Sequence, residues 1–147
     1  MHPFVRTAIT ALLMIVPAAA IASSDIAMHR DPGCGCCEKW AAQVRQQFHR
    51  KVQIIDDADR GVLQRRVGVS TDLSSCHTAL VDGMAFEGHV PIVDMKRALT
   101  QRPKWVRGLA VAGMPLGSPG MEMPGRPAQP YAVVAFGPAE QRLFARH

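Results

Sequence analysis

The chain has 147 residues, a length that accommodates one folded domain with short tails. Charged residues make up 20% of it and hydrophobic residues 48%, which excludes an acidic disordered chain and a fibrous repeat protein. The net charge of +5 is spread along the chain and only 5% of the residues are aromatic, so we expect no nucleic-acid partner. The unusual numbers are four cysteines, eight methionines and six histidines.

The first 22 residues have the pattern of a secretory signal peptide. Arg6 supplies a positive charge, residues 7–16 are an apolar run of ten, and Ala20-Ile21-Ala22 matches the A-x-A cleavage rule. An uncleaved anchor is the alternative, but crossing a bilayer takes roughly 20 apolar residues. We expect cleavage of residues 1–22 and export to the periplasm, with residues 23–147 as one domain without stable membrane insertion.

The rest of the chain predicts alternating strands and helices. Trp40, Val44 and Phe48 recur with helical spacing, and the predicted helices cover residues 36–48, residues 59–67 and a segment that begins at Pro91. The predicted strands cover residues 26–29, 52–55, 78–81, 85–87, 131–136 and 141–145. Five glycines and five prolines in residues 108–130 predict a loop. This order of elements is that of a thioredoxin-like α/β fold, a mixed sheet with flanking helices.

Three of the four cysteines lie within Cys34-Gly35-Cys36-Cys37. A bridge between the neighbours Cys36 and Cys37 is strained, whereas Cys34 and Cys37 form a C-x-x-C pair of the redox type. The motif stands at the start of the first predicted helix, where free N–H groups and the helix dipole stabilise thiolates. We interpret it as a soft-metal or redox site rather than a structural disulfide framework.

The fourth cysteine, Cys76, is predicted to lie beside this motif although 39 residues separate it from Cys37. In a thioredoxin-like fold the loop that enters the third strand abuts the C-x-x-C pair and normally carries a cis-proline. Here Cys76 and His77 occupy that place. Crowded thiolates favour Cu(I), held as one ion or as a thiolate-bridged cluster, over zinc, which is typical of well-spaced cysteine pairs.

Two histidines and two methionines are candidates to complete or shield the site. His77 follows Cys76, and His89 lies between a predicted hairpin and a predicted helix. Met114 and Met121 lie in the 108–130 loop, where there is no helical core face to fill, and thioethers bind Cu(I). The alternative for each of these residues is a purely structural role, such as a hydrogen bond in a turn or core filling.

Four blocks of the sequence, in order, resemble the signature of one known family. They are Cys34-Gly35-Cys36-Cys37 with Trp40, Ser75-Cys76-His77-Thr78, Glu87-Gly88-His89-Val90-Pro91 and the segment from Gly113 to Glu122. The family comprises exported thioredoxin-like metal-binding proteins and includes the CopG-type copper-resistance proteins. The resemblance covers residues 25–136. It implies a periplasmic location, a role in copper tolerance, and Cys34, Cys36, Cys37 and Cys76 as the copper-binding thiols.

We therefore expect a copper-binding protein that sequesters Cu(I) or changes the redox state of copper. Its partners would be copper ions and the copper-handling or redox proteins of the periplasm. A thiol–disulfide exchange enzyme is the alternative, with Cys34 as the attacking thiol and Cys37 as the resolving thiol. The additional Cys36 and the missing proline count against that enzyme. A third reading is a secreted module stabilised by disulfides and without metal.

Overall fold

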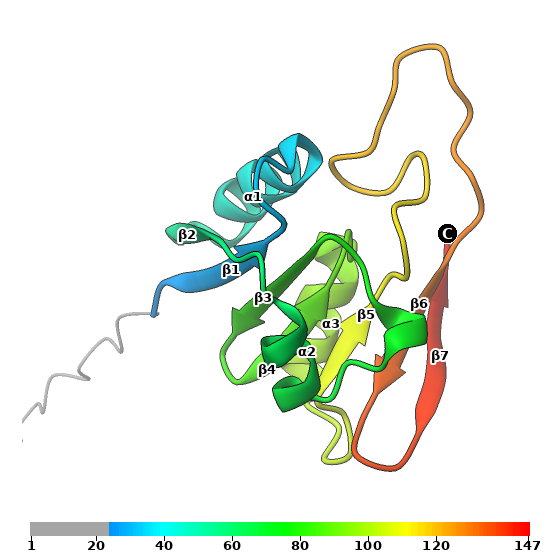
Figure 1. Cartoon of the computed structure of the whole chain (residues 1–147). Coiled ribbons are helices and arrows are strands. Elements are labelled where there is room, and N and C mark those ends of the chain that lie inside the picture. The colour runs from blue at the N-terminus through cyan, green and yellow to red at the C-terminus, as the bar shows by residue number, and fades with distance from the viewer. Residues whose placement is uncertain (1–23) are drawn as a thin grey trace, which may run out of the picture.

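The computed structural model describes residues 24–147, so the predicted signal peptide over residues 1–22 lies outside the described residues. That part of the chain forms one mixed sheet of seven strands with helices packed against it (Figure 1). The strands are β1 (Ile26–Arg30), β2 (Val52–Asp56), β3 (His77–Val81), β4 (Met84–Glu87), β5 (Gly108–Ala110), β6 (Ala132–Phe136) and β7 (Gln141–Arg146). The helices are α1 (Gly35–Phe48), α2 (Gly61–Val67), α3 (Ile92–Gln101) and a short 3-10 helix, Thr71–Leu73. Among the described residues, no helix has the length and apolar character to cross a membrane.

The first four strands have the arrangement of a thioredoxin-like fold. Their order in the sheet is β2-β1-β3-β4. β1 runs parallel to β2, while β3 runs antiparallel to both β1 and β4. α1 provides the crossover that the parallel pair β1 and β2 requires. The predicted α/β class with a mixed sheet is therefore confirmed, and β5, β6 and β7 extend the sheet beyond β4.

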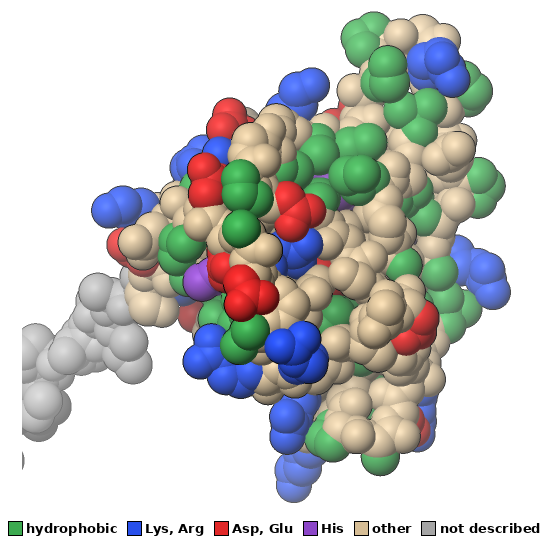
Figure 2. All heavy atoms as spheres, in the orientation of Figure 1, with side chains coloured by type: hydrophobic (Ala, Val, Ile, Leu, Met, Phe, Trp, Pro, Cys, Tyr) green, Lys and Arg blue, Asp and Glu red, His purple; other side chains and the backbone are tan. Residues whose placement is uncertain are grey.

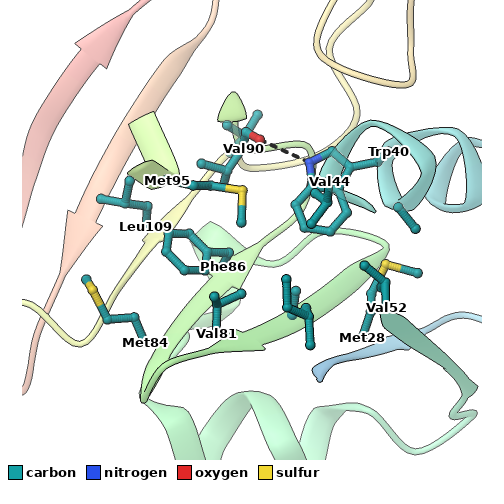
Figure 3. Close-up of a cluster of buried hydrophobic side chains, with 14 of the residues drawn as sticks. Met28, Trp40, Val44, Val52, Val81, Met84, Phe86, Val90, Met95 and Leu109 are labelled. Atoms are coloured by element: carbon teal, nitrogen blue, oxygen red, sulfur yellow. Dashed lines mark hydrogen bonds between the residues drawn. The ribbon is translucent and has the colours of Figure 1, made fainter. Parts of the chain in front are cut away.

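A hydrophobic core lies between the sheet and the helices α1 and α3 (Figure 3). Trp40 of α1 and Met95 of α3 are fully buried in this core together with Phe86 of β4. Trp40 also donates a hydrogen bond of 3.0 Å from Nε1 to the carbonyl oxygen of Val90. Cys37 lies on the same buried face of α1. The core therefore fixes the position of the first helical turn, which carries two of the cysteines.

One prediction about the fold is wrong. Residues 108–130 are predicted as a loop, but the segment begins with β5, which pairs with β4 and with β6. At Gly108 the neighbouring strand passes so close that a Cβ atom would stand 2.0 Å from the carbonyl oxygen of Ala85. A glycine required by such a close approach looks, in the sequence, like a glycine of a flexible loop. The irregular segment covers residues 111–131, called the 111–131 loop below.

The 111–131 loop projects from the body of the domain (Figure 1). Backbone hydrogen bonds within it join Gly117 N–H to Met121 (3.1 Å) and Gln129 N–H to Leu116 (2.8 Å). Hydrophobic and basic side chains gather on its protruding end, whereas acidic and basic side chains are interspersed over the rest of the visible face (Figure 2). The loop is therefore held by its own contacts, and its first half returns toward α1.

Candidate metal centre

The thiols gather at one end of the sheet, where β1 leads into α1 and where β3 begins. The last residue of β1 pairs with the first residue of β3, so the two connections lie side by side. A hydrogen bond of 3.0 Å from the N–H of Asp31 to the carbonyl oxygen of Cys76 joins them. Cys34 is the residue immediately before α1. This pairing brings Cys76 against the first turn of α1, as the thioredoxin-like fold predicts.

The four sulfur atoms form one cluster, within 4.8 Å of one another. Cys34 and Cys37 are joined by a disulfide, and Cys36 and Cys76 are free thiols. The Cys36 sulfur lies 3.4 Å from the Cys34 sulfur, and the Cys76 sulfur lies 3.4 Å from the Cys37 sulfur. Cys37 and Cys76 are buried, whereas Cys34 and Cys36 are partly exposed. One side of the cluster is therefore accessible from solvent and the other belongs to the core.

Two buried imidazoles face the Cys76 sulfur. His89 Nε2 lies 3.1 Å from it and His77 Nδ1 lies 3.5 Å from it, and neither side chain is exposed to solvent. His89 Nδ1 donates a hydrogen bond of 2.8 Å to the carbonyl oxygen of Pro119 in the 111–131 loop. Burial lowers the pKa of His89, and it lowers the pKa of His77 further with help from His89 and Arg60. Both rings are therefore neutral and able to act as ligands.

Cys76 stays a neutral thiol in this environment. Burial raises the pKa of Cys76 to about 12, and the nearby Cys36 adds to the rise. A metal ion that binds this sulfur has to displace the proton, because the thiolate is the form that binds metals. Only an ion with high affinity for sulfur can do so at neutral pH.

The two methionines singled out in the sequence lie on segments that flank the thiols. Met114 is 53% exposed and follows Gly113, which forms hydrogen bonds with the connection that leads to Cys76. Met121 is half-buried and follows Gly120. A Cβ atom at Gly120 would stand 2.8 Å from the carbonyl oxygen of Cys36, so this part of the loop rests on the first turn of α1. Ligation by either thioether remains a prediction.

The sequence reasoning missed two buried charged residues that hold the Cys76 connection in place. Glu87, fully buried at the end of β4, accepts hydrogen bonds from the N–H of Ser75 (2.8 Å) and from Arg60 Nη1 (3.2 Å). It also accepts hydrogen bonds from Gln64 and Thr78. Arg60 in turn donates to the carbonyl oxygen of Ser75 and to Asp31. A glutamate in an otherwise apolar short strand was the signal available in the sequence.

Four cysteine sulfurs, two of them now bonded to each other, and two neutral imidazoles at short distances are the kinds of donor that soft metal ions prefer. No carboxylate belongs to the donor groups found among residues 24–147 around these sulfurs, which disfavours hard cations such as Mg²⁺ or Ca²⁺. The fold and the site together define a class of protein. It is a thioredoxin-like domain in which two further cysteines extend the C-x-x-C pair to a sulfur cluster that could hold a metal ion.

Comparisons with known proteins identify the family within this class. Two similar solved structures are described as copper resistance protein CopG, form 1 and form 2. Form 1 is 36% identical with a TM-score of 0.76, and the match covers 85% of this chain and 98% of that one. Form 2 is 36% identical with a TM-score of 0.74, and the match covers 84% and 97%. This chain belongs to the CopG family of copper-resistance proteins.

Two further comparisons add little to this assignment. A family model described as a protein of unknown function, DUF411, matches residues 73–121, which include Cys76, both buried histidines and the first half of the 111–131 loop. No curated protein matches the chain.

Proposed function

We propose that this protein binds Cu(I) as cargo on the thiolates of Cys34, Cys36, Cys37 and Cys76 when all four are reduced. The observation that carries the proposal is the mutual distance of the four sulfurs, all within 4.8 Å. Thiolates select Cu(I), and sulfurs at this spacing can each bridge two ions, so the site could hold a small cluster as well as one ion. The names of the similar solved structures support copper as the metal.

The disulfide suggests how the protein could also change the redox state of copper. Oxidation of the Cys34 and Cys37 thiolates to a disulfide releases two electrons, which reduce two Cu(II) ions to two Cu(I) ions. A thiol reductant of the compartment would then reopen the disulfide by exchange. In this proposal the signal peptide places the protein in the periplasm, where oxidising conditions make such a cycle possible.

The test is a titration of the fully reduced protein with Cu(I) under anaerobic conditions, followed by metal and thiol analysis. We expect at least one bound Cu(I) per chain, and a loss of affinity or stoichiometry in Cys36→Ser and in Cys76→Ser. Met123→Leu is the control, because Met123 is an exposed methionine of the 111–131 loop that is not among the proposed ligands. Binding that survives both cysteine substitutions would contradict the proposal.

A second candidate function is thiol–disulfide exchange with protein substrates. The observation that favours it is the Cys34–Cys37 disulfide at the start of α1, with Cys34 partly exposed to solvent. If this is the function, Cys34→Ser abolishes the reduction of insulin, while Cys36→Ser leaves both that activity and copper binding unchanged.

A further inference from the structure

Basic residues that are far apart in the sequence gather at the end of the sheet opposite to the cysteines. β1, β2, β4, β5 and β7 begin at that end, and β3 and β6 end there. The basic end, as we call it, comprises residues 24–25, 49–51, 82–83, 102–107 and 137–140 together with the last two residues of α2 and the first two of β7. It carries seven cations, Arg50, Lys51, Arg66, Arg102, Lys104, Arg107 and Arg142, and three acidic residues, Asp25, Asp82 and Glu140.

The basic end holds the whole net charge of residues 23–147. The full chain has a net charge of +5, of which Arg6 in the predicted signal peptide supplies one. The excess of four cations at the basic end accounts for the rest, because the other charged residues of 23–147 balance, with nine of each sign. The remainder of the domain, including the end that carries the cysteines, therefore has no net charge.

Four cations of the basic end have no carboxylate partner among residues 24–147. Each of the three acidic residues is already in an ion pair with another cation of this end: Asp25 with Lys51, Asp82 with Arg50 and Glu140 with Arg142. The cations left over are all exposed: Arg66, Arg102, Lys104 and Arg107. Their charges are therefore free to meet an anionic surface.

These four cations lie around one hollow in the surface. The hollow, of about 280 Å³, is lined by Arg107, by Gly83 of the β3–β4 turn and by the apolar side chains of Val67, Leu80 and Ala85. Val67 follows Arg66 in α2, and Arg102 donates a hydrogen bond of 3.1 Å to the carbonyl oxygen of Asp82 in the same turn. Figure 2 shows basic side chains over and below α2. Apolar walls among cations match the chemistry of an anionic lipid, which joins a charged headgroup to apolar chains.

The described chain also begins at the basic end. Arg50 donates hydrogen bonds to the carbonyl oxygen of Ser24 (2.7 Å) and to its hydroxyl (3.2 Å), and it pairs with Asp82 in the β3–β4 turn. Residues 1–22, the predicted signal peptide, therefore join the domain at this end. A signal peptide is held at the membrane until it is cleaved, so export brings the basic end next to the lipid headgroups.

We propose that the basic end binds the surface of a membrane that contains anionic lipids, without insertion of the domain. Lipid phosphates would meet Arg66, Arg102, Lys104 and Arg107, since each basic residue near an anionic surface strengthens binding. The cysteines and the 111–131 loop, at the opposite end of the sheet, then face away from the membrane. This orientation leaves them accessible from the surrounding solution. The proposal does not depend on the metal that the cysteines bind.

The test is sedimentation of the protein without residues 1–22 with vesicles made of equal parts of phosphatidylglycerol and phosphatidylcholine. We expect binding at low salt that added salt abolishes, and none to vesicles of phosphatidylcholine alone. Arg66→Glu/Lys104→Glu should weaken binding about tenfold or more, because it reverses two of the free charges. Lys39→Glu/Arg126→Glu is the matched control, since it changes the net charge equally at exposed residues outside the basic end, and it should retain binding.

Three results would overturn this proposal. The first is the absence of sedimentation with the mixed vesicles at low salt. The second is an equal loss of binding in the two double variants, which would reflect net charge rather than this surface. The third is retention on immobilised polyglutamate without binding to the vesicles, which would assign the basic end to an acidic protein. The comparison of the two lipid compositions needs no variant, so it decides the matter even if a substitution impairs folding.

Discussion

At the scale of single residues, the two free thiols differ in exposure although their sulfurs belong to one cluster. Cys36 is partly exposed on the first turn of α1, whereas Cys76 is buried between α1 and the two histidines. Burial holds the pKa of Cys76 near 12, so almost none of it is thiolate at neutral pH. In the proposed function, the accessible thiol would therefore meet incoming copper first and the buried one would hold it.

This difference predicts two phases when the disulfide-closed protein reacts with a soluble thiol reagent at pH 8. We expect the Cys36 thiol to react quickly. Cys76 should react on the order of a thousandfold more slowly than an ordinary thiol, because the rise of its pKa from 9.0 to about 12 lowers its thiolate population by about that factor. Its rate should increase as the pH rises. Cys36→Ser should remove the fast phase and Cys76→Ser the slow one. Equal rates for the two thiols would show that Cys76 is not protected.

At the scale of elements, the 111–131 loop and the Cys76 connection are each held against the core by specific contacts. Gly120 has a φ of +85° and lies against the backbone of Cys36 and Trp40, while the neighbouring Pro119 carbonyl orients His89. The site is therefore built from three separate elements: α1, the start of β3 and the loop.

The loop contact can be tested by comparing two glycines of the same conformation. Gly120→Ala should displace the 111–131 loop and weaken Cu(I) binding, because the new Cβ atom would stand 2.8 Å from the backbone nitrogen of Trp40. Gly125 has a φ of +74° with open space around it, so Gly125→Ala carries only the backbone strain. We expect Gly120→Ala to lower the free energy of unfolding more than Gly125→Ala does. Equal effects would mean that the close approach to α1 is unimportant.

The buried pair of Glu87 and Arg60 is a second test at this scale. Glu87→Ala leaves the Ser75 N–H and the Arg60 guanidinium without a main partner, and we expect a loss of about 3–5 kcal/mol in the free energy of unfolding by denaturant. Glu140→Ala removes a surface carboxylate paired with Arg142 and should change stability by about 0.5 kcal/mol or less. A loss for Glu87→Ala as small as that of the control would contradict the structural role given to Glu87.

At the scale of the whole molecule, we expect the fold to be independent of its disulfide. The bridge between Cys34 and Cys37 spans a sequence separation of three, so it restricts the unfolded chain little. The core that Trp40, Met95 and Phe86 form lies between the sheet and two helices, and we expect it to stay packed in either redox state. We therefore expect the scaffold to stay folded whether the cysteines are oxidised, reduced or, as proposed, loaded with copper.

Reduction of the disulfide should accordingly lower the free energy of unfolding by about 2 kcal/mol or less, and a single cooperative transition should persist. The measurement is thermal unfolding with and without a phosphine reductant. Cys34→Ser, which cannot form the bridge, should match the reduced wild-type protein and show no disulfide-dependent shift. Unfolding of the wild-type protein on reduction would contradict this prediction.

Much of the fold follows from local features of the chain. The spacing of Trp40 and Val44 predicts α1, and short apolar runs predict β1, β2, β3, β4, β6 and β7 to within about two residues. β5 is missed because Gly108 is there to allow a close approach between strands, a contact with residues far away in the chain. The Glu87 and Arg60 pair is missed for the same reason, since 27 residues separate its members.

The sequence by itself determined the sulfur chemistry of this protein: three cysteines in four residues, a fourth preceding a strand, and the order of elements that brings them together. Only the tertiary structure decided which sulfurs lie next to each other, which thiol is buried and which carbonyl orients His89. The physical reason is that residue type and spacing are local properties. Burial, and with it the pKa of Cys76 and the unpartnered nitrogen of His77, arises where separate elements pack together.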